Sequence, residues 1–360
     1  DGVLIKEGAY LASQTNNDIA ILTAASDIIM SDGSMIKTGG ATQLSSTSGD
    51  ITLGHILSAN PALDLTGGGM VVTNGAVTIS TGGHIIDGNS ATNSSTEVAN
   101  IETLGTINLI AGTGIGTDID GFVVKSDAIG NLTSASGNIV VNLQTLSGAS
   151  VTVNEMTAGD ATVTSDAQMV IGASSSDAGF DISGNLLLTV SSGNLIQNAA
   201  IEAAGRTKLD VASDVTLNHA GNDLSTLVIT SAANLLVEDA SGLSVSGTVT
   251  GNISVSAGGA LTMGATAMGG NLVASSAGAI TGIGPLAVTG SSDLTATVVS
   301  LAGANDFGGS VDLTVAGATT LNDVNALSVK GTSGSDMVLT SVGDVALDLL
   351  TIGSGTQSAN

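Results

Sequence analysis

The chain has 360 residues, and its formal net charge of −25 comes from 31 acidic and only 6 basic side chains. Proteins that bind nucleic acids contact the phosphates through clustered Lys and Arg, so this charge excludes that class. An apolar content of 42% excludes a disordered acidic tail, no apolar run is long enough for a membrane helix, and the lack of Cys excludes a disulfide scaffold.

The composition favours strands over helices. Gly, Ser, Thr, Val and Ile are abundant, whereas the helix formers Glu, Lys, Arg and Gln are scarce. Short segments in which apolar and polar residues alternate recur along the chain, and this alternation predicts strands. In chain order they include residues 50–54, 76–80, 106–110, 138–142, 150–154, 214–218, 251–255, 260–263, 271–274, 286–289, 311–314, 327–330 and 345–348.

A Gly-Asn-aliphatic signature stands at the start of several of these strands. It occurs at residues 251–253 and returns 19 residues later at 270–272. Further copies lie at residues 137–139, 184–186 and 193–195. Together with the spacing of the strands, this recurrence indicates a degenerate repeat of roughly 19–21 residues that contains two or three short strands.

A β-solenoid fits such repeats better than an antiparallel sandwich. A sandwich core needs large side chains, and this chain has three Phe, one Tyr and no Trp. Narrow coils are filled by small aliphatic residues, and their corners favour Gly and Asn. We therefore predict an all-β fold, a right-handed parallel β-helix (β-solenoid) of about 18 coils of roughly 19–21 residues. We expect one continuous domain over residues 1–360, a fragment of a much longer repetitive chain, with a polar loop at residues 87–100.

The sequence pattern of residues 107–116 (Ile-Asn-Leu-Ile-Ala-Gly-Thr-Gly-Ile-Gly) and of residues 277–288 resembles the repeats of filamentous-haemagglutinin-type exoproteins. The recurrent Ser-Gly-Asn-Ile/Leu segments also resemble these repeats. Proteins of this family are large bacterial surface adhesins, exported by two-partner secretion or as autotransporters, with right-handed parallel β-helices as stalks. The resemblance implies an extracellular location at the bacterial cell surface, associated with the outer membrane, and an adhesive or structural role.

Asp118 and Asp120 are the candidate metal ligands. In the segment Thr-Asp-Ile-Asp-Gly (117–121) both carboxylates project to the same side of a strand, and with the turn at Gly121 they offer hard oxygen ligands for calcium. Calcium-binding EF-hand loops and β-roll nonapeptides are absent, although residues 305–309 (Asn-Asp-Phe-Gly-Gly) faintly resemble the latter. The three histidines, at positions 55, 84 and 219, match no metal-binding spacing.

These observations predict a non-enzymatic stalk or filament segment of a large secreted adhesin that mediates cell-surface attachment or cell–cell contact. Its expected partners are flanking repeats or other copies of itself, end to end, and a receptor or glycan on a host or neighbouring cell. We predict no catalytic residue and no cofactor besides calcium. The first alternative is a self-assembling extracellular filament, sheath or biofilm-matrix protein. The second is a polysaccharide-active β-helix enzyme whose acid and base are Asp118 and Asp120.

Overall fold

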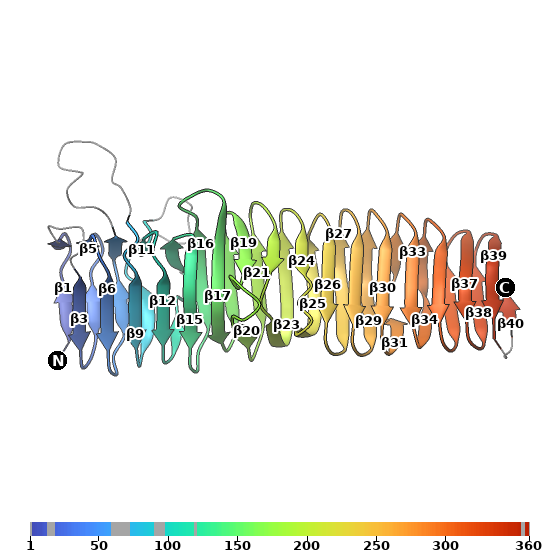
Figure 1. Ribbon diagram of the computed structural model, residues 1–360, viewed down its shortest axis with the longest axis horizontal. Helices are drawn as coiled ribbons and strands as arrows, with labels where there is room; N and C mark the ends of the chain where they lie inside the picture. Colours follow the sequence, from blue (N-terminus) through green and yellow to red (C-terminus); the bar gives the residue numbers. More distant parts are fainter. Residues whose placement is uncertain are drawn as a thin grey trace. The chain divides into compact units, whose positions relative to one another are not determined.

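Strands form every regular element in the part of the chain that the computed structural model describes, namely residues 2–12, 19–58, 73–89, 98–118, 121–353 and 357–359. These strands pair in parallel from one coil to the next, which is the predicted all-β parallel β-solenoid. None of the described residues belongs to a helix long and apolar enough to cross a membrane. The chain forms two compact units, Asp1–Ser192 and Gly193–Asn360, which Figure 1 colours from blue to green and from yellow-green to red.

Three stacks of strands make up most of the Asp1–Ser192 unit. The first stack joins the second at β16, which pairs with β13 and β14. The first stack contains β1 (Val3–Ile5), β4 (Ile28–Met30), β7 (Ile51–Leu53), β10 (His84–Asp87), β13 (Gly114–Ile115), β16 (Ile139–Gln144), β18 (Ala161–Ser165) and β21 (Leu186–Val190). The second contains β2 (Tyr10–Ala12), β5 (Met35–Thr38), β8 (His55–Ser58), β11 (Ile101–Glu102) and β14 (Phe122–Lys125). The third contains β3 (Ala20–Ala24), β6 (Thr42–Ser46), β9 (Val77–Thr81), β12 (Ile107–Ala111), β15 (Ala128–Ser134), β17 (Ser150–Ala158), β19 (Gln168–Ile171) and β20 (Gly179–Ile182).

Two stacks of strands make up the Gly193–Asn360 unit. The longest strands carry register shifts, such as those between Val245 and Gly247 and between Leu301 and Asn305, where the backbone turns a corner within one strand. The first stack contains β22 (Leu195–Gln197), β24 (Val215–Leu217), β26 (Leu235–Asp239), β28 (Ile253–Ala257), β30 (Leu272–Ser276), β33 (Ser292–Ala296), β35 (Val311–Val315), β37 (Leu327–Ser333) and β39 (Val345–Ile352). The second contains β23 (Ile201–Val211), β25 (Asp223–Ser231), β27 (Leu243–Val249), β29 (Leu261–Met268), β31 (Ala279–Gly282), β32 (Leu286–Val288), β34 (Val298–Phe307), β36 (Thr319–Asp323), β38 (Met337–Ser341) and β40 (Gln357–Ala359).

The chain makes about 15 turns, fewer than the predicted 18 or so. Coil length explains the difference. Equivalent corner residues of the Gly193–Asn360 unit lie 18 to 20 residues apart, close to the predicted repeat of 19–21. In the Asp1–Ser192 unit the corresponding separations are 22 to 34 residues, because its coils carry a third strand and longer connections. The predicted loop at residues 87–100 lies in one of these longer coils, and its central part, residues 90–97, is outside the described residues.

Stacked aliphatic side chains fill the interior of each unit. In the first unit, Ile28, Ile51 and Ile85 lie in register on successive coils, and all three are 0% exposed. In the second unit, Leu235 and Ile253 continue the same pattern and are at most 2% exposed. Burial of such side chains contributes roughly 1.5–3 kcal/mol each, so the regular core is the main source of stability.

The Gly-Asn-aliphatic signature forms one corner of the coils in which it occurs. Its polar residues stack in register immediately before the first buried residue of each strand. The backbone N–H of Asn252 donates to Asn234 Oδ1 at 2.8 Å, and the N–H of Asn271 donates to Asn252 Oδ1 at 2.8 Å. We call this series in the second unit the corner ladder, which comprises Asn194, Asp214, Asn234, Asn252, Asn271 and Ser291.

Each rung of the corner ladder is closed by a second hydrogen bond in the opposite direction. The N–H of Ile253, which follows Asn252, donates to the carbonyl of Asn271 on the next coil at 2.9 Å. The same bond joins Leu235 to Asn252 at 2.9 Å. Hydrogen bonding between coils therefore continues around the corner, where a loop would otherwise leave backbone groups unpaired.

Glycine precedes four of the six ladder residues, and at Gly251 and Gly270 the side chain of the previous coil occupies the space that a Cβ would need. A Cβ on Gly270 would lie 2.3 Å from Asn252 Oδ1, and one on Gly251 would lie 2.3 Å from Asn234 Oδ1. Real Cβ atoms do not approach other heavy atoms this closely. At these two positions the signature reflects a steric restriction, but the restriction is not general, because Ser213 and Ala233 precede the ladder residues of their coils.

Replacing Gly270 by alanine tests this requirement. We expect Gly270→Ala to lower the free energy of unfolding by about 1–3 kcal/mol, because the new methyl group forces the Asn252 amide away from its bond to the Asn271 N–H. Gly303→Ala is the matched control, since a Cβ there would meet its nearest atom at an ordinary 3.4 Å. Melting temperatures of both variants provide the measurement, and equal losses would contradict the steric explanation.

Candidate functional site

The predicted metal ligands lie only partly within the described residues. Asp118 is exposed between β13 and β14, and Asp120 is outside the described residues. Among the residues that the structure does describe, no group of three or more His, Asp or Glu side chains is placed to hold a metal ion. Calcium binding by Asp118 and Asp120 therefore stays a prediction.

Two of the three histidines bind backbone atoms. His84 Nε2 forms a hydrogen bond of 2.7 Å with the carbonyl oxygen of Gly116. His219 Nδ1 accepts a hydrogen bond of 3.1 Å from the N–H of Gly221, two residues later. Both imidazoles hold the backbone at a corner.

Two buried asparagines of the second unit each form several hydrogen bonds to backbone groups of neighbouring coils. Asn222 and Asn305 are both 0% exposed. Asn305 Oδ1 accepts the N–H of Leu286 from the preceding coil at 3.0 Å. Its Nδ2 donates to the carbonyl of Leu301 in its own coil at 2.8 Å and to that of Asn322 in the next coil at 3.0 Å. One side chain thereby joins three successive coils.

Asn222 makes the equivalent bonds. Its Oδ1 accepts the N–H of Ile201 at 2.9 Å, and its Nδ2 donates to the carbonyls of Leu217 at 3.2 Å and Glu238 at 2.9 Å. The side chain of Gln197 adds a further pair of hydrogen bonds. We call Asn222 and Asn305 the coil clamps, because each satisfies buried backbone groups that belong to neighbouring coils.

A buried aspartate lies one coil beyond the first clamp. Asp239 is 2% exposed, and its Oδ2 accepts the N–H of Leu224 at 2.6 Å. Its Oδ1 accepts the N–H of Ser241 at 2.9 Å. Burial raises the pKa of the Asp239 carboxyl, and these hydrogen bonds offset the effect only in part.

Asp323 occupies the equivalent place beyond the second clamp, with weaker partners. Its Oδ1 accepts the N–H groups of Phe307 and Asn325, each at 3.4 Å. Asp323 is 0% exposed, and its Oδ2 is buried without a hydrogen-bond partner. Burial raises the pKa of this carboxyl, and the nearby charge of Asp306 adds to the increase.

The two clamps follow a shared sequence motif that sequence analysis did not recognise. Residues 222–224 read Asn-Asp-Leu, and residues 305–307 read Asn-Asp-Phe. The second copy is the segment that faintly resembles a calcium β-roll. In the structure the Asn305 amide is wholly engaged by backbone groups, and Asp306 accepts a hydrogen bond of 2.6 Å from Asn325 Nδ2. The motif recurs after 83 residues, but residues 322–324 read Asn-Asp-Val and form no clamp, so only burial identifies it.

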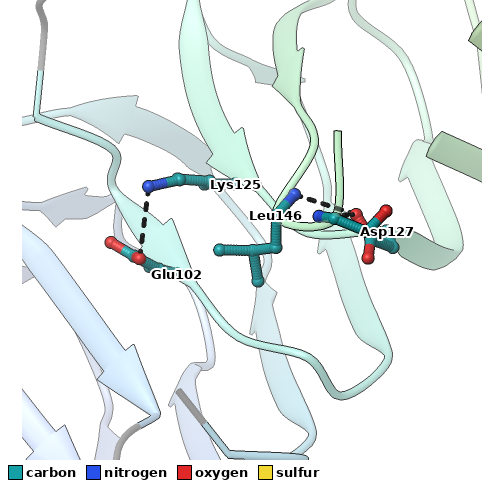
Figure 2. A network of polar contacts seen from close by, with 5 residues as sticks. Glu102, Lys125, Asp127 and Leu146 are labelled. Atoms are coloured by element: carbon teal, nitrogen blue, oxygen red, sulfur yellow. Dashed lines mark hydrogen bonds and ion pairs between the residues drawn. The ribbon is translucent and has the colours of Figure 1, made fainter. Parts of the chain in front are cut away.

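Polar contacts also join coils of the first unit (Figure 2). Lys125 Nζ lies 3.3 Å from Glu102 Oε1, its partner in strand register. Beyond it, Asp127 Oδ1 accepts hydrogen bonds from the Thr145 hydroxyl at 2.6 Å and the Leu146 N–H at 2.8 Å. Partial burial raises the pKa of Asp127, but these hydrogen bonds outweigh it and hold that pKa below the ordinary value.

Comparison with known proteins finds repeats of the same kind. A family described as repeats of unknown function (DUF5649) matches residues 158–231 and 250–314. No curated protein and no solved structure gives a significant match to the chain. The matched segments contain both coil clamps, Asn222 and Asn305. Family match and fold together identify a repetitive β-helix protein.

Truncating a clamp tests whether it holds the coils together. We expect Asn305→Ala to lower the free energy of unfolding by about 3 kcal/mol, since the buried Leu286 N–H and two backbone carbonyls lose their partner. Asn322→Ala is the control, because Asn322 is only half-buried and its side chain makes one 3.3 Å hydrogen bond, to the Ala302 carbonyl. Chemical unfolding of the two variants measures the difference, and a similar loss in both would refute the clamp role.

The Asp323 carboxyl predicts an unusual pH dependence. Because its pKa is higher in the folded than in the unfolded chain, it favours folding below the unfolded value of about 3.9 and loses that contribution as pH rises through the raised pKa. Asp323→Asn removes this titration, so we expect the variant to become progressively more stable relative to the parent as the pH rises from 3 to 7. The exposed Asp293→Asn is the control. A pH-independent difference in melting temperature between Asp323→Asn and parent would show the pKa is not raised.

Proposed function

We propose that this chain is a stiff spacer, a stalk or filament segment of a large secreted bacterial surface adhesin. The observation that carries the proposal is the continuity of hydrogen bonding between coils within each unit. Parallel strands join successive coils in both units, and in the second unit the corner ladder joins six successive coils at the corner while the coil clamps add bonds in the core at two places. In such an array each repeat is stabilised by its neighbours, so stiffness is a collective property.

The surface chemistry supports a role as a spacer. The net charge of −25 makes copies of the chain repel one another, which keeps it soluble and discourages lateral association. Ser, Thr, Asn and Asp side chains that point outward do not disturb the packing of the core. Adhesion itself would belong to longer connections, such as residues 87–100, or to flanking domains that contact a receptor or glycan.

Location and adhesive role rest on the resemblance of residues 107–116 and 277–288 to filamentous-haemagglutinin-type repeats. On that basis we propose export and an extracellular position associated with the outer membrane. We propose no catalytic activity. Calcium bound by Asp118 and Asp120 is a further part of the proposal.

A self-assembling filament, sheath or matrix protein is the second candidate, and one observation fits it as well as it fits the first. Large apolar side chains are exposed on the first and the last described coils: Ile19 and Ile21 at 64% and 65%, and Val342 and Leu349 at 83% and 89%. Exposed apolar residues on unpaired strand edges are suited to receive another coil. That coil comes from flanking repeats in the first proposal and from a second copy in this one.

Cells that carry the natural gene test the proposal. With an antibody against residues 193–360, immunogold microscopy is expected to label the outside of intact cells, and deletion of the gene is expected to reduce surface attachment about tenfold or more. Label confined to the cell interior, or unchanged attachment, would overturn it. The mass of the mature protein separates the candidates: a chain of thousands of residues fits the stalk, and a short chain in long homopolymers fits the filament.

A further inference from the structure

An exposed Asp-Gly pair forms the turn between β4 and β5. Asp32 and Gly33 are its central residues, and one hydrogen bond of 3.0 Å, from the Ser34 N–H to the Ser31 carbonyl, closes it. Both central residues are exposed, and Gly33 has a φ of 69°. A Cβ placed on Gly33 would meet no heavy atom within 4 Å. The pair therefore lies in open space on the surface of the Asp1–Ser192 unit.

The two reacting groups of an Asp-Gly pair are the side-chain carboxyl carbon and the glycine nitrogen. When the nitrogen attacks that carbon, a five-membered cyclic imide forms and one water molecule leaves. Water then opens the ring at either carbonyl, which gives aspartate or isoaspartate, so the net change is an isomerisation that needs no other reactant. Glycine favours the attack, because it has no side chain to hinder the approach or to restrict backbone rotation.

Both reacting groups are free at residues 32–33. Within the described part of the chain, neither the Gly33 N–H nor the Asp32 carboxylate has a hydrogen-bond partner. The turn is closed by a single hydrogen bond at the surface, so it opens locally at low cost in free energy. Local opening lets the nitrogen reach the side-chain carbon while the stacked strands stay paired.

An Asn-Gly pair at residues 74–75 can undergo the same ring closure with loss of ammonia, but coil packing holds its backbone. Gly75 is buried, and its N–H donates to Ser58 Oγ at 3.1 Å. A Cβ on Gly75 would overlap the Gly40 carbonyl oxygen, so this backbone is packed against another coil. Ring closure at Asn74 therefore requires the loss of a buried hydrogen bond and a shift between coils.

The Asp-Gly pair at residues 87–88 is held at both reacting groups. The Gly88 N–H donates to the Leu53 carbonyl of the preceding coil at 2.7 Å. Asp87 Oδ1 accepts the Asn89 N–H and the Asn100 side-chain amide, each at 2.7 Å. Neither the nitrogen nor the carboxylate can move toward the other without breaking these bonds.

We propose that Asp32 is a site of spontaneous conversion to isoaspartate, and that coil packing protects Asn74 and Asp87 from the same reaction. The product carries an extra methylene in the backbone between the Cα of residue 32 and Gly33. This change falls in a turn that leads directly into Ser34, which is 0% exposed. The inference does not depend on the proposed function.

Peptide mapping of the whole chain tests the proposal, because electron-transfer fragmentation distinguishes isoaspartate from aspartate. The rate of modification at each site is measured in the folded chain and in the chain unfolded in urea. We expect folding to slow the reaction at Asp32 by less than about tenfold and at Asn74 by about a hundredfold or more. Asp32→Glu is the matched variant: ring closure through the longer side chain is unfavourable, so modification of that peptide is expected to disappear.

Removing the hydroxyl that holds Gly75 tests the cause of the protection. We expect Ser58→Ala to speed modification of Asn74 in the folded chain by about tenfold and to leave the rate at Asp32 unchanged. An unchanged rate at Asp87 would show that the coils of this variant remain packed. Folding that slows Asp32 as strongly as Asn74, or an Asn74 rate that Ser58→Ala does not alter, would overturn the proposal.

Discussion

The structure depends on one constraint: successive coils must stay hydrogen-bonded to each other where the chain turns a corner. The corner leaves little space for the side chain of the residue before the turn. The corner ladder meets this constraint by placing an asparagine side-chain oxygen of one coil on the backbone N–H of the next. The space it takes excludes a Cβ from the preceding residue, as the 2.3 Å approach at Gly270 shows. Glycine and asparagine usage in this chain therefore follows from corner geometry.

The coil clamps extend the same principle into the core. A buried corner cannot be solvated, so Asn222 and Asn305 supply the donor and acceptor that water would otherwise provide. The buried carboxylates that follow them, Asp239 and Asp323, are less well suited to this task. They accept hydrogen bonds but have no cation beside them among their identified contacts, and burial raises their pKa values.

Much of the fold could be predicted from sequence, because strand alternation and the Gly-Asn-aliphatic signature are local patterns. The signature's copies at residues 251–253 and 270–272 do lie on one corner, one coil apart. The number of coils is harder to predict, because coil length is regular only in the second half of the chain. Coils of the first unit carry a third strand, and the spacing of 34 residues between Asp50 and His84 has no repeat signal. The coil clamps were missed because Asn-Asp-Phe at residues 305–307 reads as a surface turn, and only burial distinguishes it.

The candidate sites illustrate the same limit. Asp118 could be named from its spacing to Asp120, but the structure describes only the first of the two. The Asp-Gly pair at residues 32–33 and the Asn-Gly pair at residues 74–75 can be found in the sequence, but nothing there shows which of them is protected. The difference follows from coil stacking, which places the Ser58 hydroxyl on the Gly75 N–H and leaves open space beside Gly33.

Hydrogen exchange of the unmodified protein measures the central claim most directly. The N–H groups of Asn252, Asn271 and Ser291 belong to exposed residues, yet each donates to the ladder residue of the preceding coil. If the corner ladder holds the coils together, these amides exchange as slowly as those of the adjoining strands β28, β30 and β33. Exchange as fast as at an exposed turn residue such as Ser175 would contradict the account.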